Sequence, residues 1–191
     1  NTGLMYMQLY SDDFEKIPEM KAHFINSSVN GYLKRGVHKA EDVHRIFGLA
    51  TAKEQPYFDV VTNKTLINYT KDMYYRNTFQ NNVAENADRV IDLMMIYDTI
   101  VYIQEEAQGL PKYSAMGLPR AHNNRIPFLG LDFHDKNGYS AWYYIGMSPR
   151  NVPKALDPNA IWNRKVTNYN NSVVAAVWNT RLRAECLLGA V

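Results

Sequence analysis

One long apolar segment, Ala84–Pro111, constrains the fold of this chain more than any other feature. From Val90 onward its apolar side chains recur at the spacing of a helix, i, i+3, i+4, i+7, i+10 and i+11. Gly109 favours the left-handed conformation that closes a helix, and Pro111 cannot continue one. The middle of the segment is apolar nearly all round, which is typical of a buried helix. We therefore expect one long buried helix over about 84–108, roughly 37 Å in length.

The same segment has a second interpretation as a pair of strands. Arg89–Tyr97 and Ile100–Glu106 would pair around a turn at Asp98-Thr99, because the centre is rich in β-branched and aromatic residues. Strong helix formers at both ends of the segment favour the helix.

Two shorter elements precede this segment. Pro56–Thr62 and Thr65–Tyr69 flank a short polar turn and predict an antiparallel hairpin. His38–Phe47 places its apolar residues on one face and predicts a short helix, with Gly48 at its C-terminal end. The stretch Met73–Asn86 is polar and aromatic, and we expect it to be a loop leading into the long helix.

The short helix carries a resemblance to a known family. The pattern Gly36-Val37-His38, then Asp42-Val43, then Phe47-Gly48 resembles the short helix of small envelope lipoprotein domains of the SmpA/OmlA type, over about 13 residues. The resemblance implies a helix followed by antiparallel strands. His38 stands where that family usually has Thr or Ser.

The chain changes character after the long helix. Residues 109–158 hold five of the ten Gly and six of the eight Pro, which excludes long helices there. Ile126–Phe133 and Ser140–Ile145 are expected as strands, with Asp135–Gly138 as the turn between them. The predicted fold is therefore α+β: one long buried helix, short antiparallel strands or hairpins, and a loop-rich C-terminal half.

Charge divides the chain in the same place. Residues 1–110 carry 11 Lys+Arg against 15 Asp+Glu, a net −4, whereas residues 111–191 carry 10 against 4, a net +6. We expect an acidic half, 1–110, and a basic half, 111–191, packed together as one globular unit.

The most enzyme-like fragment is an apolar strand that ends in Asp132-Phe133-His134. Alternate residues at the end of a strand point to one side, so Asp132 and His134 predict two metal ligands of a metal-dependent hydrolase. Such a site needs further ligands, and no histidine follows His134. The sequence also has no Gly-rich phosphate loop and no nucleophile elbow. The chain is accordingly predicted to be no enzyme and to hold no metal or cofactor, with the hydrolase kept as an alternative.

Aromatic and basic residues gather in the C-terminal half. Tyrosine, tryptophan and arginine are enriched at protein interfaces. The predicted interface residues are Trp142, Tyr143, Tyr144, Arg150, Trp162 and Trp178. On a strand, Trp142 and Tyr144 point one way and Tyr143 the other, so one short element cannot bury all three rings unless both of its faces are covered. The same mixture also suits single-stranded nucleic acid, which gives a second alternative.

These features predict a non-enzymatic structural or assembly subunit of a virion, an organelle complex or an envelope machine. Its partners would be protein subunits, in a homo- or hetero-oligomer, with nucleic acid as the alternative partner and a small envelope lipoprotein-like module as a further alternative function. Asp92 and Asp98 interrupt the best candidate for a membrane span, and the lone cysteine, Cys186, excludes an internal disulfide. The chain begins at Asn1 without Met, which suggests processing during export, organelle import or virion maturation, and the compartment stays open.

Overall fold

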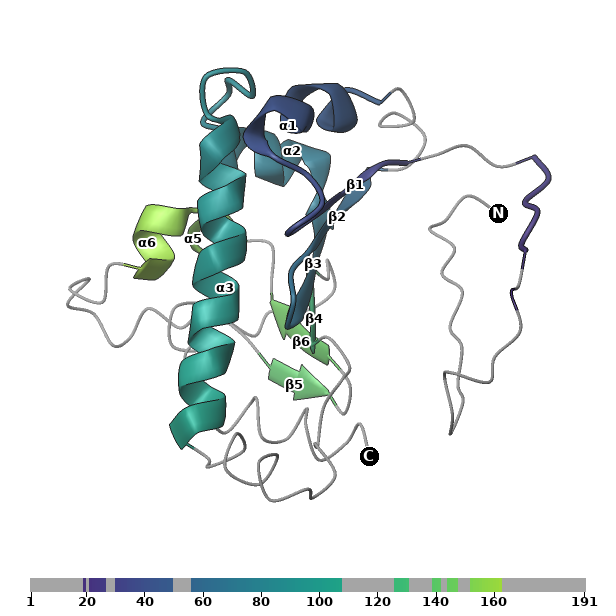
Figure 1. Ribbon diagram of the computed structural model, residues 1–191. Helices are drawn as coiled ribbons and strands as arrows, with labels where there is room; N and C mark the ends of the chain where they lie inside the picture. Colours follow the sequence, from purple (N-terminus) through teal and green to yellow (C-terminus); the bar gives the residue numbers. More distant parts are fainter. Residues whose placement is uncertain are drawn as a thin grey trace.

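A mixed sheet and one long helix form the two main layers of the computed structural model (Figure 1). The structure describes residues 19, 21–26, 30–49, 56–107, 126–130, 139–141, 144–147 and 152–162, and the side chains of all these except 103–107, 126–130, 139–141, 144–147 and 162. The strands are β1 (Tyr32–Lys34), β2 (Tyr57–Val61), β3 (Thr65–Thr70), β4 (Ile126–Gly130), β5 (Tyr139–Ala141) and β6 (Tyr144–Met147). The helices are α1 (Ala40–Phe47), α2 (Lys71–Met73), the π-helix η3 (Tyr74–Thr78), α3 (Ala87–Ala107), α5 (Val152–Ala155) and α6 (Pro158–Trp162). This arrangement confirms the predicted α+β fold.

The six strands lie in the order β1-β2-β3-β4-β6-β5. β2 and β3 form the predicted antiparallel hairpin, in which Val60 lies opposite Ile67. The pairs β1 with β2, β3 with β4, and β4 with β6 are parallel. A single sheet therefore contains strands from both the acidic and the basic half of the sequence.

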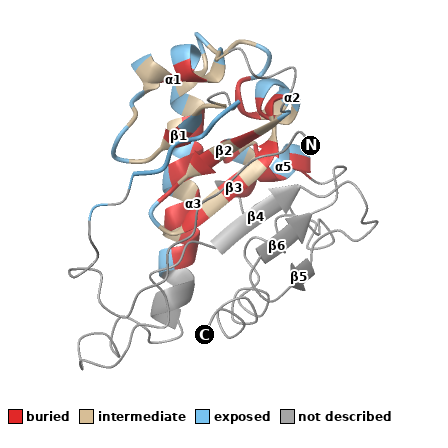
Figure 2. Ribbon diagram, turned by 90° about the vertical axis from the view of Figure 1, so that its right-hand side faces the viewer, coloured by how far each residue is buried: buried red, intermediate tan, exposed pale blue. Residues whose placement is uncertain are grey.

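Helix α3 confirms the prediction of one long helix, and the interpretation as two strands is wrong. Its buried residues follow the predicted spacing: Val90, Leu93, Met94, Tyr97, Ile100 and Val101. The helix packs one side against the sheet, as Figure 2 shows, and leaves Met95 and Tyr102 exposed on its outer side. None of the described helices is long and apolar enough to cross a membrane.

Helix α1 forms over Ala40–Phe47, within the predicted range, and buries Val43 and Ile46. The Asp42 carboxylate accepts the backbone N–H of Lys39 at 3.1 Å, which satisfies one of the free donors at the start of the helix. This hydrogen bond, together with the ion pair to Arg45, lowers the pKa of Asp42. At the other end Gly48 is the C-cap, as predicted; it keeps a right-handed conformation and donates its backbone N–H to the His44 carbonyl at 3.0 Å, the ordinary helical hydrogen bond.

Two local expectations are wrong. The stretch Met73–Asn86, expected as a loop, begins instead with the last residue of α2 and continues directly into η3. The Thr70 side chain caps this helical segment by accepting the Met73 N–H at 3.3 Å, and Tyr74 is fully buried. Burial of Tyr74 against the sheet stabilises a turn that the polar sequence does not favour by itself.

The second correction concerns the C-terminal strands. The strand expected over Ser140–Ile145 is divided into β5 and β6, which pair antiparallel with each other. Because β5 reverses the chain, β6 runs parallel to β4 rather than forming a hairpin with it. The turn expected at Asp135–Gly138 lies outside the described residues.

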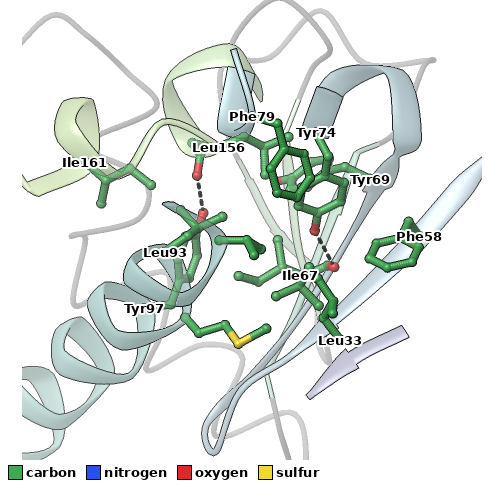
Figure 3. Close-up of a cluster of buried hydrophobic side chains, with 14 of the residues drawn as sticks. Leu33, Phe58, Ile67, Tyr69, Tyr74, Phe79, Leu93, Tyr97, Leu156 and Ile161 are labelled. Carbon is green, nitrogen blue, oxygen red and sulfur yellow. Dashed lines mark hydrogen bonds between the residues drawn. The ribbon is translucent and has the colours of Figure 1, made fainter. Parts of the chain in front are cut away.

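Aromatic rings fill the core between the sheet and the helices (Figure 3). Phe47 contacts Phe58 and Phe79 edge-on, with ring centroids 5.3 and 4.9 Å apart. Tyr74 lies edge-on to Phe58 at 5.9 Å and to Tyr69 at 6.4 Å. Edge-to-face pairs at these distances stabilise a core beyond the area that they bury.

Two neighbouring tyrosines in this core differ in how their hydroxyl groups are satisfied. The Tyr74 hydroxyl donates to the Ile67 carbonyl at 2.8 Å. The Tyr69 hydroxyl is buried and has no hydrogen-bond partner within the described part of the chain. Burying an unsatisfied hydroxyl costs free energy, because its hydrogen bonds to water are lost without replacement.

We expect Tyr69→Phe to raise the free energy of unfolding by roughly 1–2 kcal/mol, since only the unsatisfied hydroxyl is removed. Tyr74→Phe, the matched control, should lower it by about 1 kcal/mol because a satisfied hydrogen bond is lost. Urea denaturation of the two variants measures both values. A loss of stability in Tyr69→Phe would show that this hydroxyl is hydrogen-bonded in the folded protein.

Candidate functional site

Three parallel strands bring their carboxyl ends to the same side of the sheet. β3, β4 and β6 run in the same direction, and their last residues are Thr70, Gly130 and Met147. In open sheets with parallel strands, ligands bind in the crevice outside the carboxyl ends of the strands. The predicted metal ligands Asp132 and His134 follow β4 directly in the sequence and lie outside the described residues.

Lys71 lies at the carboxyl end of β3, immediately after the strand. This lysine is only 7% exposed. The Nζ atom donates to the carbonyl oxygens of Leu49 at 3.2 Å and Phe47 at 3.4 Å. It also lies 5.3 Å from the ring centroid of Phe58, close enough for a cation–π interaction. These contacts tie the end of α1 to the end of β3.

Burial lowers the pKa of the Lys71 ammonium group, because the charged form is poorly hydrated there. A lysine with a lowered pKa can serve as a base or nucleophile when a substrate reaches it. Two carbonyl oxygens and an aromatic ring surround this amino group, so its geometry is that of a structural tie.

The lowered pKa gives a prediction for the pH dependence of stability. Between the folded and the unfolded pKa of Lys71, the unfolded chain binds more protons, so the free energy of unfolding rises with pH in that window. We expect wild type to gain stability relative to Lys71→Met as the pH rises toward the ordinary lysine pKa of about 10.4, measured by urea denaturation. Burial raises the pKa values of Tyr69 and Tyr97, so these tyrosines lower the free energy of unfolding above the ordinary tyrosine pKa. Both proteins contain them, so this contribution cancels in the difference between wild type and Lys71→Met. A difference that does not change with pH would contradict the prediction.

Asp98 is a buried carboxylate on α3 that joins three parts of the fold. It forms an ion pair with Arg35, which follows β1. Its oxygens also accept the backbone N–H groups of Asn63 at 3.1 Å and Lys64 at 2.9 Å. The helix thereby holds the turn of the β2–β3 hairpin, whose Asn-Lys sequence is weak turn chemistry. A carboxylate used in this way is a structural group.

A second ion pair attaches α5 and α6 to α3. Arg89 donates to Asp157 at 2.8 Å and to the Thr78 carbonyl at 2.7 Å. Asp157 also accepts the backbone N–H of Asn159 at 3.0 Å at the start of α6. The Tyr97 hydroxyl donates to the Ala155 carbonyl at 3.0 Å. These bonds join residues far apart in the sequence. Through them α5 and α6, which belong to the basic half, are attached to the core.

Sequence reasoning did not identify these connecting residues. A signal for Asp98 was present, since a carboxylate inside an apolar helical stripe requires a buried partner. The sequence could not indicate which cation or turn would satisfy it. Lys71 carried no signal, because one lysine after a strand is ordinary.

Within the described ranges there is no cluster of three or more His, Cys, Asp or Glu side chains able to hold a metal ion. The carboxylates of Asp98 and Asp157 are already bound to arginine and backbone donors. The described part of the chain therefore does not fit a catalytic metal, and any metal site depends on residues such as Asp132 and His134.

The predicted interface also lies mostly beyond the described structure. Tyr144 begins β6 and Trp162 ends α6, and in both cases the description covers the backbone only. Trp142, Tyr143, Arg150 and Trp178 are outside the described residues altogether. Their role in binding protein or nucleic acid stays a prediction.

The fold is similar to that of several solved structures. A functionally unknown conserved protein from Bacillus anthracis matches 70% of this chain with a TM-score of 0.56 and 18% identity. A metallopeptidase from Bacteroides thetaiotaomicron matches 85% of this chain with a TM-score of 0.57 and 16% identity. The catalytic module of the metalloprotease ZmpA from Clostridium perfringens matches 65% with a TM-score of 0.50 and 17% identity. This chain spans about a quarter of each of these structures, 25–26% of their length.

No protein-family model and no curated protein matches the chain. The likeness of residues 36–48 to envelope lipoprotein helices thus has no support from these comparisons. The structural similarities correct the predicted function: the fold is of the kind found in metallopeptidase modules, and the prediction of a structural or assembly subunit is wrong. That prediction rested on composition and missing motifs, which do not encode how strands and helices are connected.

Proposed function

We propose that this chain forms part of a metal-dependent peptidase module, supplying the sheet and the long covering helix. The observation that carries the proposal is the match of 85% of the chain to a metallopeptidase and of 65% to a metalloprotease catalytic module. The reaction class would be hydrolysis of peptide bonds.

The shared direction of β3, β4 and β6 supports the same proposal, since Asp132 and His134 follow the carboxyl end of β4 in the sequence. The His-Glu-x-x-His pair that binds zinc in many metallopeptidases does not occur among the 191 residues. Asp132 and His134 are therefore the candidate ligands that this chain offers.

Zinc binding by the purified chain tests the proposal. After equilibration with Zn²⁺ and dialysis, elemental analysis should find about one zinc ion per chain. Asp132→Asn and His134→Gln should each weaken zinc binding by at least about tenfold. His44→Gln is the matched control, because His44 is exposed on α1 and should leave zinc binding unchanged.

Hydrolysis is measured on the same samples with a mixture of fluorogenic peptides, with and without a chelator. Chelator-sensitive cleavage that is lost in His134→Gln supports the proposal, and this assay also tests the prediction that the chain is no enzyme. If the wild-type chain binds no zinc and cleaves no peptide, these residues do not form a metal-dependent peptidase site.

A further inference from the structure

β1 lies at the end of the sheet, and its outer side is not paired with any other described strand. In a strand, the N–H and C=O groups of alternate residues point to opposite sides. Arg35 donates its N–H to the Val61 carbonyl of β2 at 2.9 Å. Leu33 and Arg35 therefore face β2, whereas the backbone groups of Tyr32 and Lys34 face the open edge. Such an edge is a template for pairing with another chain.

The backbone groups of Lys34 are nevertheless occupied. Its N–H donates to Nδ1 of His38 at 3.0 Å, so the imidazole takes the place of a strand carbonyl. Its carbonyl accepts the N–H groups of His38 at 3.0 Å and Val37 at 3.2 Å. The chain that leaves β1 thus folds back and uses both outward groups of this residue.

The tight turn after β1 brings His38 back to Lys34, only four residues earlier in the sequence. Gly36 has a φ of +78°, a conformation that favours glycine and directs the chain back toward the edge. The His38 ring also packs edge-on against Tyr32, with ring centroids 5.6 Å apart. His38 therefore contacts both residues whose backbone groups face the open side.

We propose that His38 closes the β1 edge of the sheet to strand addition by a second copy of the chain. A second copy is the relevant partner because two identical edges can pair antiparallel about a two-fold axis. With Lys34 occupied, only Tyr32 has outward groups left in β1, and one residue is too short to form a stable pair of strands.

Amide hydrogen exchange in the wild-type chain gives the first test. Lys34 and Tyr32 both face the open edge, so they form an internal comparison within one strand. The Lys34 amide should exchange at least about tenfold more slowly than the Tyr32 amide, because within the described part of the chain only the Lys34 amide of these two donates a hydrogen bond. Equal rates would show that the closure does not exist.

Self-association gives the second test. His38→Leu removes the acceptor of the Lys34 N–H and leaves the backbone hydrogen bonds to the Lys34 carbonyl in place, whereas His38→Asn keeps an oxygen near the position of Nδ1. Analytical ultracentrifugation should show at least about a tenfold tighter dimer for His38→Leu than for wild type, and His38→Asn should restore the wild-type value. Val37→Ser is the control, because Val37 is 58% exposed and its side chain is not part of the closure.

The two tests overturn the proposal independently. If the Lys34 amide exchanges rapidly in His38→Leu and the variant still associates no more strongly than wild type, His38 does not guard the edge. If Val37→Ser dimerises as strongly as His38→Leu, the association comes from a general change of this surface. Should His38→Leu fail to fold, the exchange rates of wild type and His38→Asn decide the question.

Discussion

Replacing Asp98 with alanine is expected to lower the free energy of unfolding by about 3 kcal/mol, the lower end of the usual cost of removing one partner of a buried ion pair, because the Arg35 side chain is 34% exposed. The variant leaves Arg35 without its carboxylate and the Asn63 N–H without its Asp98 acceptor, and it removes the shorter of two hydrogen bonds of the Lys64 N–H, which keeps the Thr62 hydroxyl at 3.2 Å. The loss is measured by urea denaturation.

Asp92→Ala is the matched control, because Asp92 is an exposed aspartate on the same helix. Its effect should stay within about 0.5 kcal/mol. Amide exchange at Asn63 and Lys64 should accelerate in Asp98→Ala and stay unchanged in Asp92→Ala. If the two alanine variants are equally stable, the carboxylate does not hold the hairpin turn.

Phe47→Ala should lower the free energy of unfolding by about 3 kcal/mol, at the lower end of the range for truncating a core phenylalanine. The ring packs edge-on against Phe58 and Phe79 and lies 5.8 Å from the Lys71 amino group. The full range is not expected, because Phe47 is only partly buried.

Phe47→Leu keeps most of the buried volume and should cost only about 1 kcal/mol, which separates packing from a general disturbance of α1. Thermal or urea denaturation of both variants measures the difference. An alanine variant as stable as the leucine variant would show that the ring contributes little to the core.

The local sequence determined those helices and strands in which buried residues recur at a regular spacing. The spacing of apolar residues from Val90 to Val101 predicted α3, and the alternation around Asn63-Lys64 predicted the β2–β3 hairpin. Both patterns work because a residue's neighbours in space are a fixed number of positions away in the sequence. The α1 helix was predictable for the same reason.

The strand that leads to Asp132 and His134 was predictable, since β4 forms within the expected range and its carboxyl end lies beside those of β3 and β6. The two residues themselves lie outside the described residues, and their role as metal ligands stays a prediction. The roles of Lys71 and His38 were not predictable. Each depends on a carbonyl or an amide group that the folded backbone brings to it.

Tertiary structure alone decided the parallel pairing of β4 with β3 and β6, the helical conformation of Tyr74–Thr78 and the partners of Asp98. The physical reason is common to all three. Periodicity along a segment records which of its sides is buried, whereas hydrogen bonds and ion pairs between distant segments depend on where the whole chain places them. The sequence therefore determined the long helix and the hairpin, and the packing of the folded chain determined how Arg35 and Asp98 hold them together.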